Sequence, residues 1–445
     1  MSDPARDLVL RRLAAQARRF PDLDLADLDT AALPPRDAAF AHAIYDAVIR
    51  RWLTLAHLLN RRLTQPLSTA DPRAAAALLA GAAQLLLLDK VPPHAAINHA
   101  VEWTKRRAGR GAAGMVNAVL RRIADLRAPG DPLPRWADEP DQLLLSDGRA
   151  LRLTEPAFPD APSERLAAVT GTPAPLLRAW ASRMTPDQVR TAALHTLITP
   201  PVILNTTHAQ SPLDTSLLAP HDHPGHHVFT GSHAQLLSLL ASRSDLWVQD
   251  PASSLAVAGV ADLRPRLILD LCAGQGTKTR QLAAVFPNAE ILATDVDPAR
   301  YRTLESVFAG HSRVCVRPPA EVAERARAAG GAHLILLDVP CSNTGVLARR
   351  PEARYRFGRD TLDSLRAVQR QIIADAIPLL VPAPSRGVIL YSTCSLEDAE
   401  NTDQAAWART WHGFTLQRER RHLPQAVPGD PPGAYTDGSY SVLLA

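Results

Sequence analysis

The stretch Leu267–Thr279 reads LILDLCAGQGTKT, and it carries the clearest structural signal in the chain. A run of leucine and isoleucine ends at Asp270, a turn with Gly274 and Gly276 follows, and a helical pattern begins near Lys278. Glycine tolerates positive φ and lets a ligand approach the backbone, and the first N–H groups of a helix attract polar or anionic ligands. The stretch therefore predicts a strand, a tight loop and a helix N-terminus that form a nucleotide cradle.

Further apolar runs follow the cradle and alternate with helical spacers. EILAT precedes Asp295, RVCV covers 313–316, HLILL precedes Asp338, and GVILYST precedes Cys394. This alternation predicts a doubly wound α/β domain with a parallel sheet, in which ligands bind at the carboxyl ends of the strands. A carboxylate at the place of Asp295 commonly accepts the hydroxyls of a ribose in NAD and adenosylmethionine binders, and its alternative role is a helix N-cap.

Two cysteines stand where two of these strands end. LLDVPCSNTG places Asp338 and Cys341 after one strand, and LYSTCSLEDAEN places Cys394 after another. Neighbouring strands lie about 5 Å apart, so we expect the two thiols to face one site beside the cradle. Hydride transfer does not require two thiols, whereas activation of an unreactive pyrimidine carbon can use them. A buried structural cysteine is the ordinary alternative for each thiol considered alone.

Length and composition indicate a multidomain globular protein. The chain has 445 residues, 46% of them hydrophobic, and 38 prolines, which fits two or three domains. Its start is charged, unlike a secretory signal, and the apolar stretch 74–88 is too short to span a bilayer. The four cysteines lack metal-ligand spacing. We therefore predict a monomeric, soluble, cytoplasmic protein with reduced thiols and no metal.

The N-terminal third has helical periodicity and a basic charge. Apolar residues recur every three or four positions over 36–62, and Asp71 and Pro72 have the pattern of an N-cap and a first helical residue. Residues 1–130 contain 19 Lys/Arg and 12 Asp/Glu. A basic helical bundle of this kind suits a polyanionic partner.

The amino-acid sequence of this bundle is more informative than its periodicity. RDAAFAHAIYDAVIRR, LLLLDKVPPHAAINHAVEWTK and VNAVLRR resemble the antitermination-factor, NusB-like RNA-binding domain, which we place at 1–130. The resemblance implies phosphate-facing side chains at Arg106, Arg107, Arg110, Arg121 and Arg122. The alternative for these arginines is a solvated helix face.

The middle of the chain is less informative. Residues 131–165 are dense in Pro, Asp and Gly, which predicts a linker. Alternating helical and strand patterns over 166–240 predict a small α+β subdomain that assists RNA binding, and 241–445 forms the core domain. A histidine cluster between His221 and His233 is interpreted as a polar loop, because no carboxylate or cysteine lies at ligand spacing.

The motifs DVPCSNTG and STCS together resemble the RNA cytosine carbon-5 methyltransferases, and with the NusB-like domain they resemble the ribosomal RNA small subunit methyltransferase B (RsmB, or Sun) family. The resemblance implies a class I methyltransferase core that uses S-adenosyl-L-methionine. Cys394 would be the nucleophile, Cys341 would release the product, and Asp338 would contact the base. Arg349, Arg350 and Arg354 would hold neighbouring nucleotides. The implied cofactor-binding residues are Cys272, Ala273, Gly274, Gln275, Gly276, Thr277, Lys278, Asp295 and Asp338.

Two departures from the family pattern concern the cofactor. The family cradle commonly reads CAAPGGKT, whereas this chain has CAGQGTKT, so we expect a different loop conformation at Thr277. Where the family has an acid facing the adenine, this chain has Pro318 and Pro319, with Glu321 the nearest carboxylate. Both changes predict a weaker cofactor affinity.

The sequence thus predicts methylation of carbon 5 of a cytidine in RNA, with small-subunit (16S) ribosomal RNA the favoured substrate. A tRNA cytosine methyltransferase and a non-catalytic antitermination-type RNA-binding factor are the alternatives. A Rossmann-type oxidoreductase is a further class, although the third glycine of its fingerprint is missing.

Overall fold

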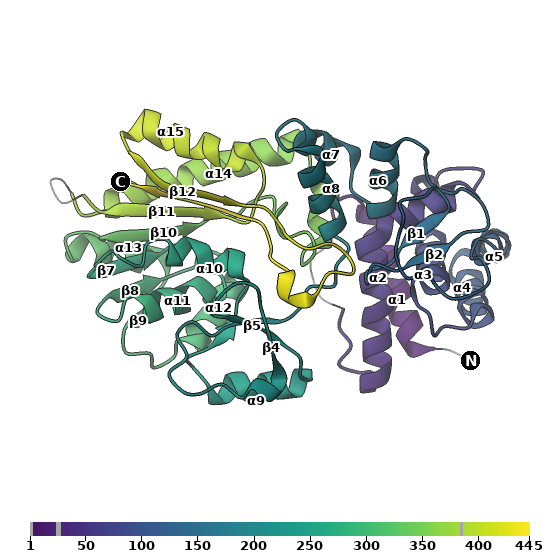
Figure 1. The fold of residues 1–445 in the computed structure, drawn as a ribbon, viewed down its shortest axis with the longest axis horizontal. Coiled ribbons are helices and arrows are strands. Elements are labelled where there is room, and N and C mark those ends of the chain that lie inside the picture. The colour runs from purple at the N-terminus through teal and green to yellow at the C-terminus, as the bar shows by residue number, and fades with distance from the viewer. Residues whose placement is uncertain (1–2, 24–27, 383–385) are drawn as a thin grey trace. The chain divides into compact units, whose positions relative to one another are not determined.

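The computed structural model describes residues 3–23, 28–382 and 386–445. The chain forms two compact units (Figure 1). The first unit comprises Met1–Thr199, Leu347–Phe357 and Val427–Asp430, and the second comprises Pro200–Val346, Gly358–Ala426 and Pro431–Ala445. Among the described helices, none combines the length and apolar character needed to cross a membrane.

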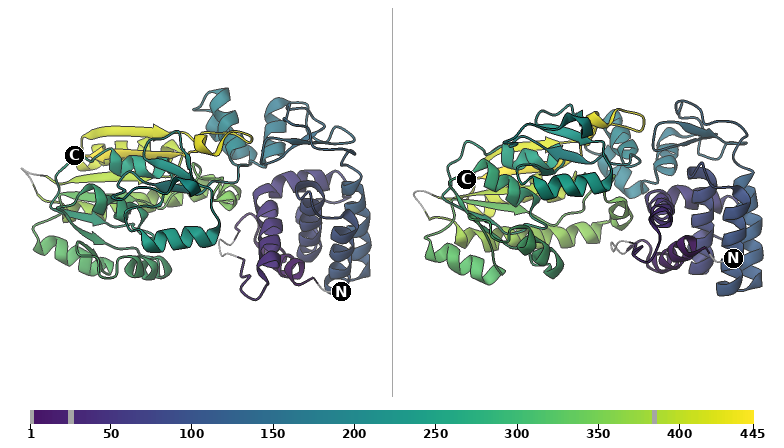
Figure 2. Two further views of the ribbon diagram at one scale, coloured as in Figure 1. Left: turned by 60° about the horizontal axis from the view of Figure 1, so that its bottom comes forward. Right: turned by 90° about the horizontal axis from the view of Figure 1, so that it is seen from below.

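Five helices form the body of the first unit, and Figure 2 shows them as the purple to dark blue ribbons. They are α1 (Pro4–Arg19), α2 (Pro35–Asn60), α3 (Pro72–Leu87), α4 (Pro93–Ala108) and α5 (Arg110–Ala124). Four of them begin with proline, whose fixed φ suits a first helical residue. As predicted, Asp71 caps α3, where its side chain accepts the N–H of Arg73. The helix α3 is buried from Ala74 to Leu86 and packs against the other four.

The predicted linker is folded. Residues 131–165 contain a hairpin of β1 (Gln142–Leu144) and β2 (Ala150–Arg152) and the start of α6 (Pro162–Thr170). The hairpin buries Leu143, Leu144 and Leu151, so these leucines stabilise it despite the surrounding Pro, Asp and Gly. Two more helices, α7 (Ala174–Ala181) and α8 (Pro186–His195), complete this part of the first unit.

A seven-stranded sheet forms the centre of the second unit. Its order is β12-β13-β11-β10-β7-β8-β9. The predicted parallel strands are β7 (Leu267–Asp270), β8 (Glu290–Ala293), β9 (Val314–Val316), β10 (Leu334–Asp338) and β11 (Val388–Thr393). The sheet is mixed, because β13 (Ser439–Leu444) and β12 (Leu416–His422) add in antiparallel orientation.

Helices cover both faces of this sheet. Apolar side chains of α10 (Pro251–Ala258), α11 (Thr277–Val285) and α12 (Pro298–Val307) pack in one core with Ile268 and Leu336. Those of α13 (Pro319–Ala328), α14 (Arg359–Ala376) and α15 (Thr402–His412) pack in another with Leu269 and Leu337. Successive residues of each strand thus enter opposite cores, as the continuous apolar runs predict. The doubly wound α/β prediction is confirmed, with the two antiparallel strands as an addition.

A small sheet precedes the central one and shifts the predicted domain boundary. Its order is β4-β5-β3-β6, from β3 (Ile203–Asn205), β4 (Leu218–Pro220), β5 (His226–Phe229) and β6 (Trp247–Val248), with α9 (His233–Ser242) beside it. The unit boundary falls between Thr199 and Pro200, so the predicted subdomain 166–240 is divided between the two units. Helices α6 to α8 bury their apolar faces in the first unit, which a local pattern of helix and strand cannot reveal.

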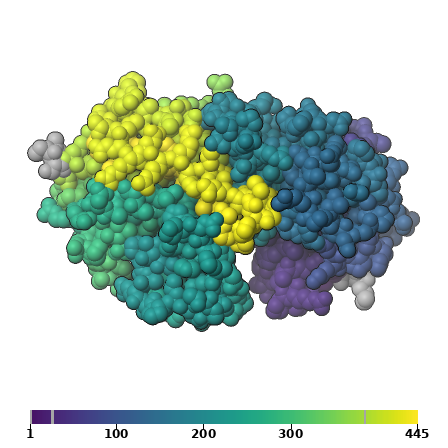
Figure 3. Space-filling model, in the orientation of Figure 1, coloured from purple at the N-terminus to yellow at the C-terminus, as the bar shows by residue number. Residues whose placement is uncertain are grey.

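Short 3-10 turns connect several of these elements: η1 (Leu67–Thr69), η2 (Thr215–Leu217), η3 (Pro351–Arg356), η4 (Ile377–Leu379), η5 (Asp398–Glu400) and η6 (Pro432–Ala434). The C-terminal part of the chain, yellow in Figure 3, lies at the surface in this view. Strand β12 is the edge of its sheet and is charged and exposed along most of its length. Charged edge strands resist unwanted pairing with other chains.

Candidate active site

The predicted cradle lies between β7 and α11. Gly274 and Gly276 have φ of 57° and 93°, so glycine occupies both left-handed positions of the loop. Thr277 is the first residue of α11, so it has a helical backbone conformation and not a positive φ. Although Thr277 departs from the family pattern, it is compatible with this loop. Helix α11 has no side-chain cap, which leaves its first N–H groups for a ligand.

The two glycines differ in what surrounds them, and this difference gives a test. A Cβ at Gly276 would lie 2.6 Å from Cε2 of Phe308, whereas a Cβ at Gly274 would meet no described atom within 4 Å. We expect Gly276→Ala to destabilise the fold by about 3 kcal/mol, through strained φ and overpacking. Gly274→Ala should cost only about 1–2 kcal/mol, from its φ alone.

The cofactor should respond differently from the fold. The Gly274→Ala methyl group fills space at the cradle. If S-adenosylmethionine, the cofactor that the resemblance implies, binds at this loop, we expect its binding in isothermal titration calorimetry to weaken by about tenfold or more. Thermal unfolding of both variants supplies the stability comparison. Unchanged cofactor affinity in the folded Gly274→Ala protein would contradict the placement of the ligand at this loop.

Asp270, at the end of β7, is fully buried. Its Oδ2 accepts the hydroxyl of Thr279 at 2.7 Å, and its Oδ1 has no hydrogen-bond partner among the described residues. Burial raises the pKa of Asp270 to about 7, against an ordinary value of 3.8. An orphaned buried acceptor, an uncapped helix N-terminus and open space at Gly274 together fit a nucleoside ligand that carries hydrogen-bond donors.

The raised pKa of Asp270 predicts a pH dependence of stability. A carboxyl whose pKa is higher in the folded state stabilises the fold below its unfolded pKa, and this contribution is lost as the pH rises toward the folded value. The melting temperature of the protein without ligand should therefore fall between about pH 4 and pH 7, as Asp270 ionises. Asp270→Asn cannot ionise and keeps an oxygen that accepts the hydroxyl of Thr279, so its melting temperature should fall less over this pH range. Parallel pH profiles for the two proteins would contradict the assignment.

Asp295 and Val296 follow β8 at the same edge of the sheet. Asp295 is buried, and its two oxygens accept the N–H groups of Gly274 and Asp297, both at 2.8 Å. Each oxygen keeps a second lone pair, so the carboxylate can still accept ribose hydroxyls. Val296 is 84% exposed. Val296 is absent from the predicted cofactor-binding residues, and its position directly after Asp295 is the signal that could have added it as a candidate.

Pro318 and Pro319 follow β9, where the resemblance leads us to expect an acid that faces the adenine. Helix α13 begins at Pro319, directly after β9 and Pro318. Glu321 is paired at 3.7 Å with Arg317 on the surface. The structure thus places this carboxylate in a surface ion pair.

Lys278 connects the cradle to β10. Its Nζ lies 2.8 Å from Oδ2 of Asp338, and Oδ1 of Asp338 accepts the hydroxyl of Ser392 at 2.7 Å. Burial by itself would lower the pKa of Lys278, but the charge of Asp338 raises it, so the lysine is cationic at neutral pH. Lys278 and Asp338, both predicted site residues, therefore form an ion pair. Ser392, which was not among the predicted residues, is hydrogen-bonded to the same carboxylate.

The two predicted cysteines meet as expected. Strands β10 and β11 are parallel neighbours, and Sγ of Cys341 lies 3.2 Å from Sγ of Cys394. The thiol of Cys394 also donates to Oδ1 of Asn343 at 3.2 Å. Asn343 has φ of 60°, a conformation that asparagine tolerates better than most residues. Its position before Thr344 and Gly345 was the available signal for this overlooked contact.

The proposed RNA-binding arginines divide into exposed and buried residues. Arg106, Arg107, Arg110, Arg121 and Arg122 are exposed on α4 and α5, and Arg349 and Arg350 are exposed in the segment 347–357. Arg354 is 0% exposed, and its guanidinium donates to the carbonyls of Thr170 and Thr196 at 3.0 and 3.2 Å. The prediction that Arg354 contacts RNA is therefore wrong, because its side chain is internal to the first unit.

The histidines of the predicted polar loop contact mainly backbone and hydroxyl groups. His221 is 2.9 Å from the carbonyl of Tyr435, and His227 is 2.9 Å from the hydroxyl of Thr206. Over residues 3–23, 28–382 and 386–445, no group of three or more His, Cys, Asp or Glu side chains has metal-binding geometry.

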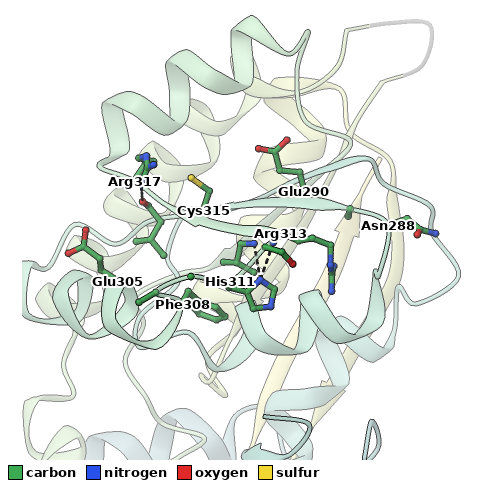
Figure 4. Close-up of a pocket in the computed structure, with 14 residues that line it drawn as sticks. Asn288, Glu290, Glu305, Phe308, His311, Arg313, Cys315 and Arg317 are labelled. Carbon is green, nitrogen blue, oxygen red and sulfur yellow. Dashed lines mark hydrogen bonds between the residues drawn. The ribbon is translucent and has the colours of Figure 1, made fainter. Parts of the chain in front are cut away.

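A pocket of about 630 Å³ lies along edge strand β9 and is lined by residues within 288–290 and 305–317 (Figure 4). Its polar groups are used internally: Nδ1 of His311 accepts the N–H groups of Arg313 and Val314, at 3.2 and 3.1 Å. The guanidinium of Arg313 donates to the carbonyls of Ala283 and Phe286. The thiols and the cradle lie elsewhere, at the carboxyl ends of β7, β8, β10 and β11, which together form the candidate active site.

Comparison with known proteins agrees with this arrangement. The NusB family model matches residues 4–125, and the model for 16S rRNA methyltransferase RsmB/F matches residues 261–416. The ribosomal RNA small subunit methyltransferase B of Xanthomonas campestris pv. campestris is 30% identical over 399 residues, which cover 84% of this chain and 81% of that protein. The chain belongs to the ribosomal RNA small subunit methyltransferase B family. Membership confirms the predicted family and supports an RNA methyltransferase as the class of enzyme.

Other relatives extend the same picture. The family member of Vibrio cholerae serotype O1 is 26% identical over 411 residues, which cover 88% of this chain and 87% of the relative. The crystal structure of PH0851 aligns with a TM-score of 0.67 and 19% identity, over 100% of this chain and 99% of that one. That structural likeness confirms the fold. The predicted NusB-like helical domain and methyltransferase core are both confirmed for this family member.

Proposed function

We propose that the protein methylates carbon 5 of a cytidine in RNA, with S-adenosylmethionine as methyl donor and small-subunit ribosomal RNA as substrate. The observation that carries the proposal is the pair of thiols 3.2 Å apart at the ends of β10 and β11. Strand β7, which leads into the cradle, is the other neighbour of β10. A nucleophile and a second thiol therefore stand beside a nucleoside-binding loop.

The chemistry of cytosine explains the need for a thiol. Carbon 5 of the ring is a poor nucleophile until a thiolate adds to carbon 6 and raises the electron density at carbon 5. We assign this addition to Cys394, so that covalent catalysis divides one difficult step into easier ones. Carbon 5 would then take the methyl group that the cofactor supplies. Transfer of the original carbon 5 proton to a base and cleavage of the bond between Cys394 and carbon 6 then restore the aromatic ring, now methylated, and free the Cys394 sulfur.

Cys341 is suited to a role as a protonated partner. Its contact with Cys394 and its burial raise the pKa of the Cys341 thiol well above the ordinary value. A thiol that retains its proton 3.2 Å from the nucleophile can donate it to the Cys394 sulfur as that sulfur leaves carbon 6, and so assist release of the adduct rather than attack the ring. This division of labour is part of the proposal.

Several residues would hold S-adenosylmethionine at the cradle. The loop Cys272–Lys278, Asp295 and Asp338 would contact its polar groups, and the exposed side chain of Val296 would pack on the adenine. The orphaned oxygen of Asp270 adds an acceptor close to this loop. When bound, the cofactor supplies an electrophilic methyl group. The cation of Lys278 meanwhile fixes the Asp338 carboxylate, which we expect to face the polar edge of the base.

RNA must present an unstacked base to reach two thiols at strand ends. The exposed arginines of α4 and α5 supply the phosphate contacts in this proposal. Binding through phosphates is sensitive to salt and largely independent of sequence, so these arginines would contribute affinity more than choice of nucleotide.

The experiment is methyl transfer from labelled S-adenosylmethionine to total RNA from cells that lack the modification. We expect the label to appear as 5-methylcytidine in the 16S fraction after nuclease digestion. Label confined to the tRNA fraction would show that the substrate is tRNA and not small-subunit ribosomal RNA. RNA binding without any transfer would overturn the enzymatic function and favour a non-catalytic RNA-binding factor.

A further inference from the structure

One buried carboxylate connects the two cysteine turns. Glu400, at the end of η5, is 0% exposed. Its Oε1 accepts the N–H of Ser342 at 2.9 Å, and its Oε2 accepts the hydroxyl of Ser395 at 2.6 Å and that of Ser342. Ser342 directly follows Cys341 and Ser395 directly follows Cys394. A single side chain therefore holds the residue after each thiol.

Neighbouring groups hold this carboxylate and the turns in place. Gln369 of α14 donates to Oε1 of Glu400 at 3.1 Å and to the carbonyl of Pro340 at 3.0 Å. The hydroxyl of Tyr391 donates to the backbone carbonyl of Glu400 at 2.6 Å. The carboxylate is thus held by α14 as well as by the two turns, and β11 holds the backbone of Glu400.

The residue after Glu400 acts on the same turn. Oδ1 of Asn401 accepts the hydroxyl of Thr393 at 2.6 Å, and Nδ2 donates to the carbonyl of Ser395 at 2.8 Å. These two contacts bracket Cys394 on both sides. Both contacts are made to residues of the Cys394 turn, so they do not determine the distance between this turn and the Cys341 turn.

Other contacts also join the two turns: the hydroxyls of Ser342 and Ser395 lie 3.0 Å apart, and the thiol of Cys394 donates to Oδ1 of Asn343. The N–H of Gly345 donates to the carbonyl of Cys394 at 2.9 Å, and the N–H of Leu396 donates to the hydroxyl of Thr344 at 2.9 Å. Burial of a carboxylate is costly unless it is well hydrogen-bonded. Glu400 meets that condition with four donors, which both turns supply jointly with Gln369.

We propose that Glu400 is a positioning residue that sets the separation of the Cys341 and Cys394 thiols through Ser342 and Ser395. The catalytic consequence of this role rests on the proposed function. The geometric role does not depend on it, since the separation of two thiols can be measured without any methyl transfer.

The test variant is Glu400→Gln, which keeps the size of the side chain. An amide has one acceptor oxygen instead of two, so its NH2 group takes the place of Oε2 and faces the hydroxyls of Ser342 and Ser395. The two charge-assisted bonds from these hydroxyls to Oε2, which join the two turns, are then lost. Asp403→Asn is the matched control, because it makes the same acid-to-amide change at an exposed position of α15.

A trivalent arsenical such as phenylarsine oxide measures the geometry directly. It forms two As–S bonds when both thiols lose their protons, and its oxygen leaves as water, so tight binding requires neighbouring thiols. We expect wild type and Asp403→Asn to bind one equivalent at Cys341 and Cys394, mapped by peptide mass spectrometry. Glu400→Gln should bind at least tenfold more weakly, and Cys394→Ala should not form the bridge.

The second readout is kinetic. With the thiols misaligned, we expect kcat for methyl transfer to fall at least tenfold in Glu400→Gln, with KM for RNA and for S-adenosylmethionine within about twofold of wild type. A general loss of folding would instead lower the melting temperature and affect cofactor binding. If Glu400→Gln does not fold, Ser342→Ala and Ser395→Ala replace it, since each removes one hydroxyl donor from the carboxylate.

Arsenical affinity equal to that of wild type in Glu400→Gln, or in both serine variants, would overturn the positioning role. Bridged thiols in a wild-type protein that transfers no methyl group would overturn the proposed function and leave the positioning role standing. The two failures are therefore distinguishable.

Discussion

Cys394→Ala is expected to reduce methyl transfer to RNA by about 10,000-fold or more, because loss of a covalent nucleophile removes the whole addition pathway. The fold should be little affected, since the thiol is only partly buried and donates one hydrogen bond, to Asn343. Transfer of labelled methyl groups at saturating RNA and cofactor measures the effect. The melting temperature and the affinity for S-adenosylmethionine should stay close to those of wild type.

Cys341→Ala should behave differently from Cys394→Ala. If Cys341 assists release, its loss leaves Cys394 bonded to carbon 6 of the base, and a protein–RNA adduct that survives denaturation should accumulate. Cys315→Ala is the matched control, because Cys315 lies on edge strand β9 beside Arg325. An adduct formed by Cys394→Ala and not by Cys341→Ala would reverse the two roles.

The second large effect is expected at Arg354 and concerns stability. Arg354→Ala should lower the free energy of unfolding by about 3–5 kcal/mol, because the carbonyl of Thr170 loses its guanidinium donor, the carbonyl of Thr196 keeps only Arg50, and a cavity remains. Burial lowers the pKa of Arg354 to about 10, so the guanidinium is still charged at neutral pH and its hydrogen bonds are charge-assisted. Thermal and urea unfolding of the full chain measure the loss.

Arg349→Ala and Arg350→Ala serve as controls for Arg354→Ala. Both side chains are exposed, so we expect stability changes within about 0.5 kcal/mol. Their effect should instead appear in RNA binding, as a weaker affinity with a smaller dependence on salt. A stable Arg354→Ala protein that has lost RNA affinity would restore the original prediction for this residue.

The sequence predicted best where the physical signal is local. Apolar runs between helical spacers predict the order of β7 to β11, and two cysteines at strand ends predict adjacent thiols. Strand β12 was missed because LQRERRH is charged on both faces, as suits an edge. The hairpin β1–β2 was missed because its short leucine pairs lie within a segment whose composition is typical of a linker.

The candidate site shows a similar limit. Arg354 looks like its exposed neighbours Arg349 and Arg350, and only tertiary packing distinguishes a buried arginine from an exposed one. Glu400 stands in a polar segment where an acid is ordinary, and its role depends on two serines 58 and 5 residues away in sequence. Contacts of such separation leave no periodic signal.

The division of the chain into two interleaved units limits how either unit could be exchanged between related genes. The backbone passes between them at five places, after Thr199, Val346, Phe357, Ala426 and Asp430. A gene fragment that ends at Thr199 would omit the loop that carries Arg354, while the remainder would carry that loop without the carbonyls of Thr170 and Thr196. Neither unit can therefore be exchanged between relatives as one uninterrupted cassette. Recombination would have to transfer the three segments of a unit together to move that unit whole.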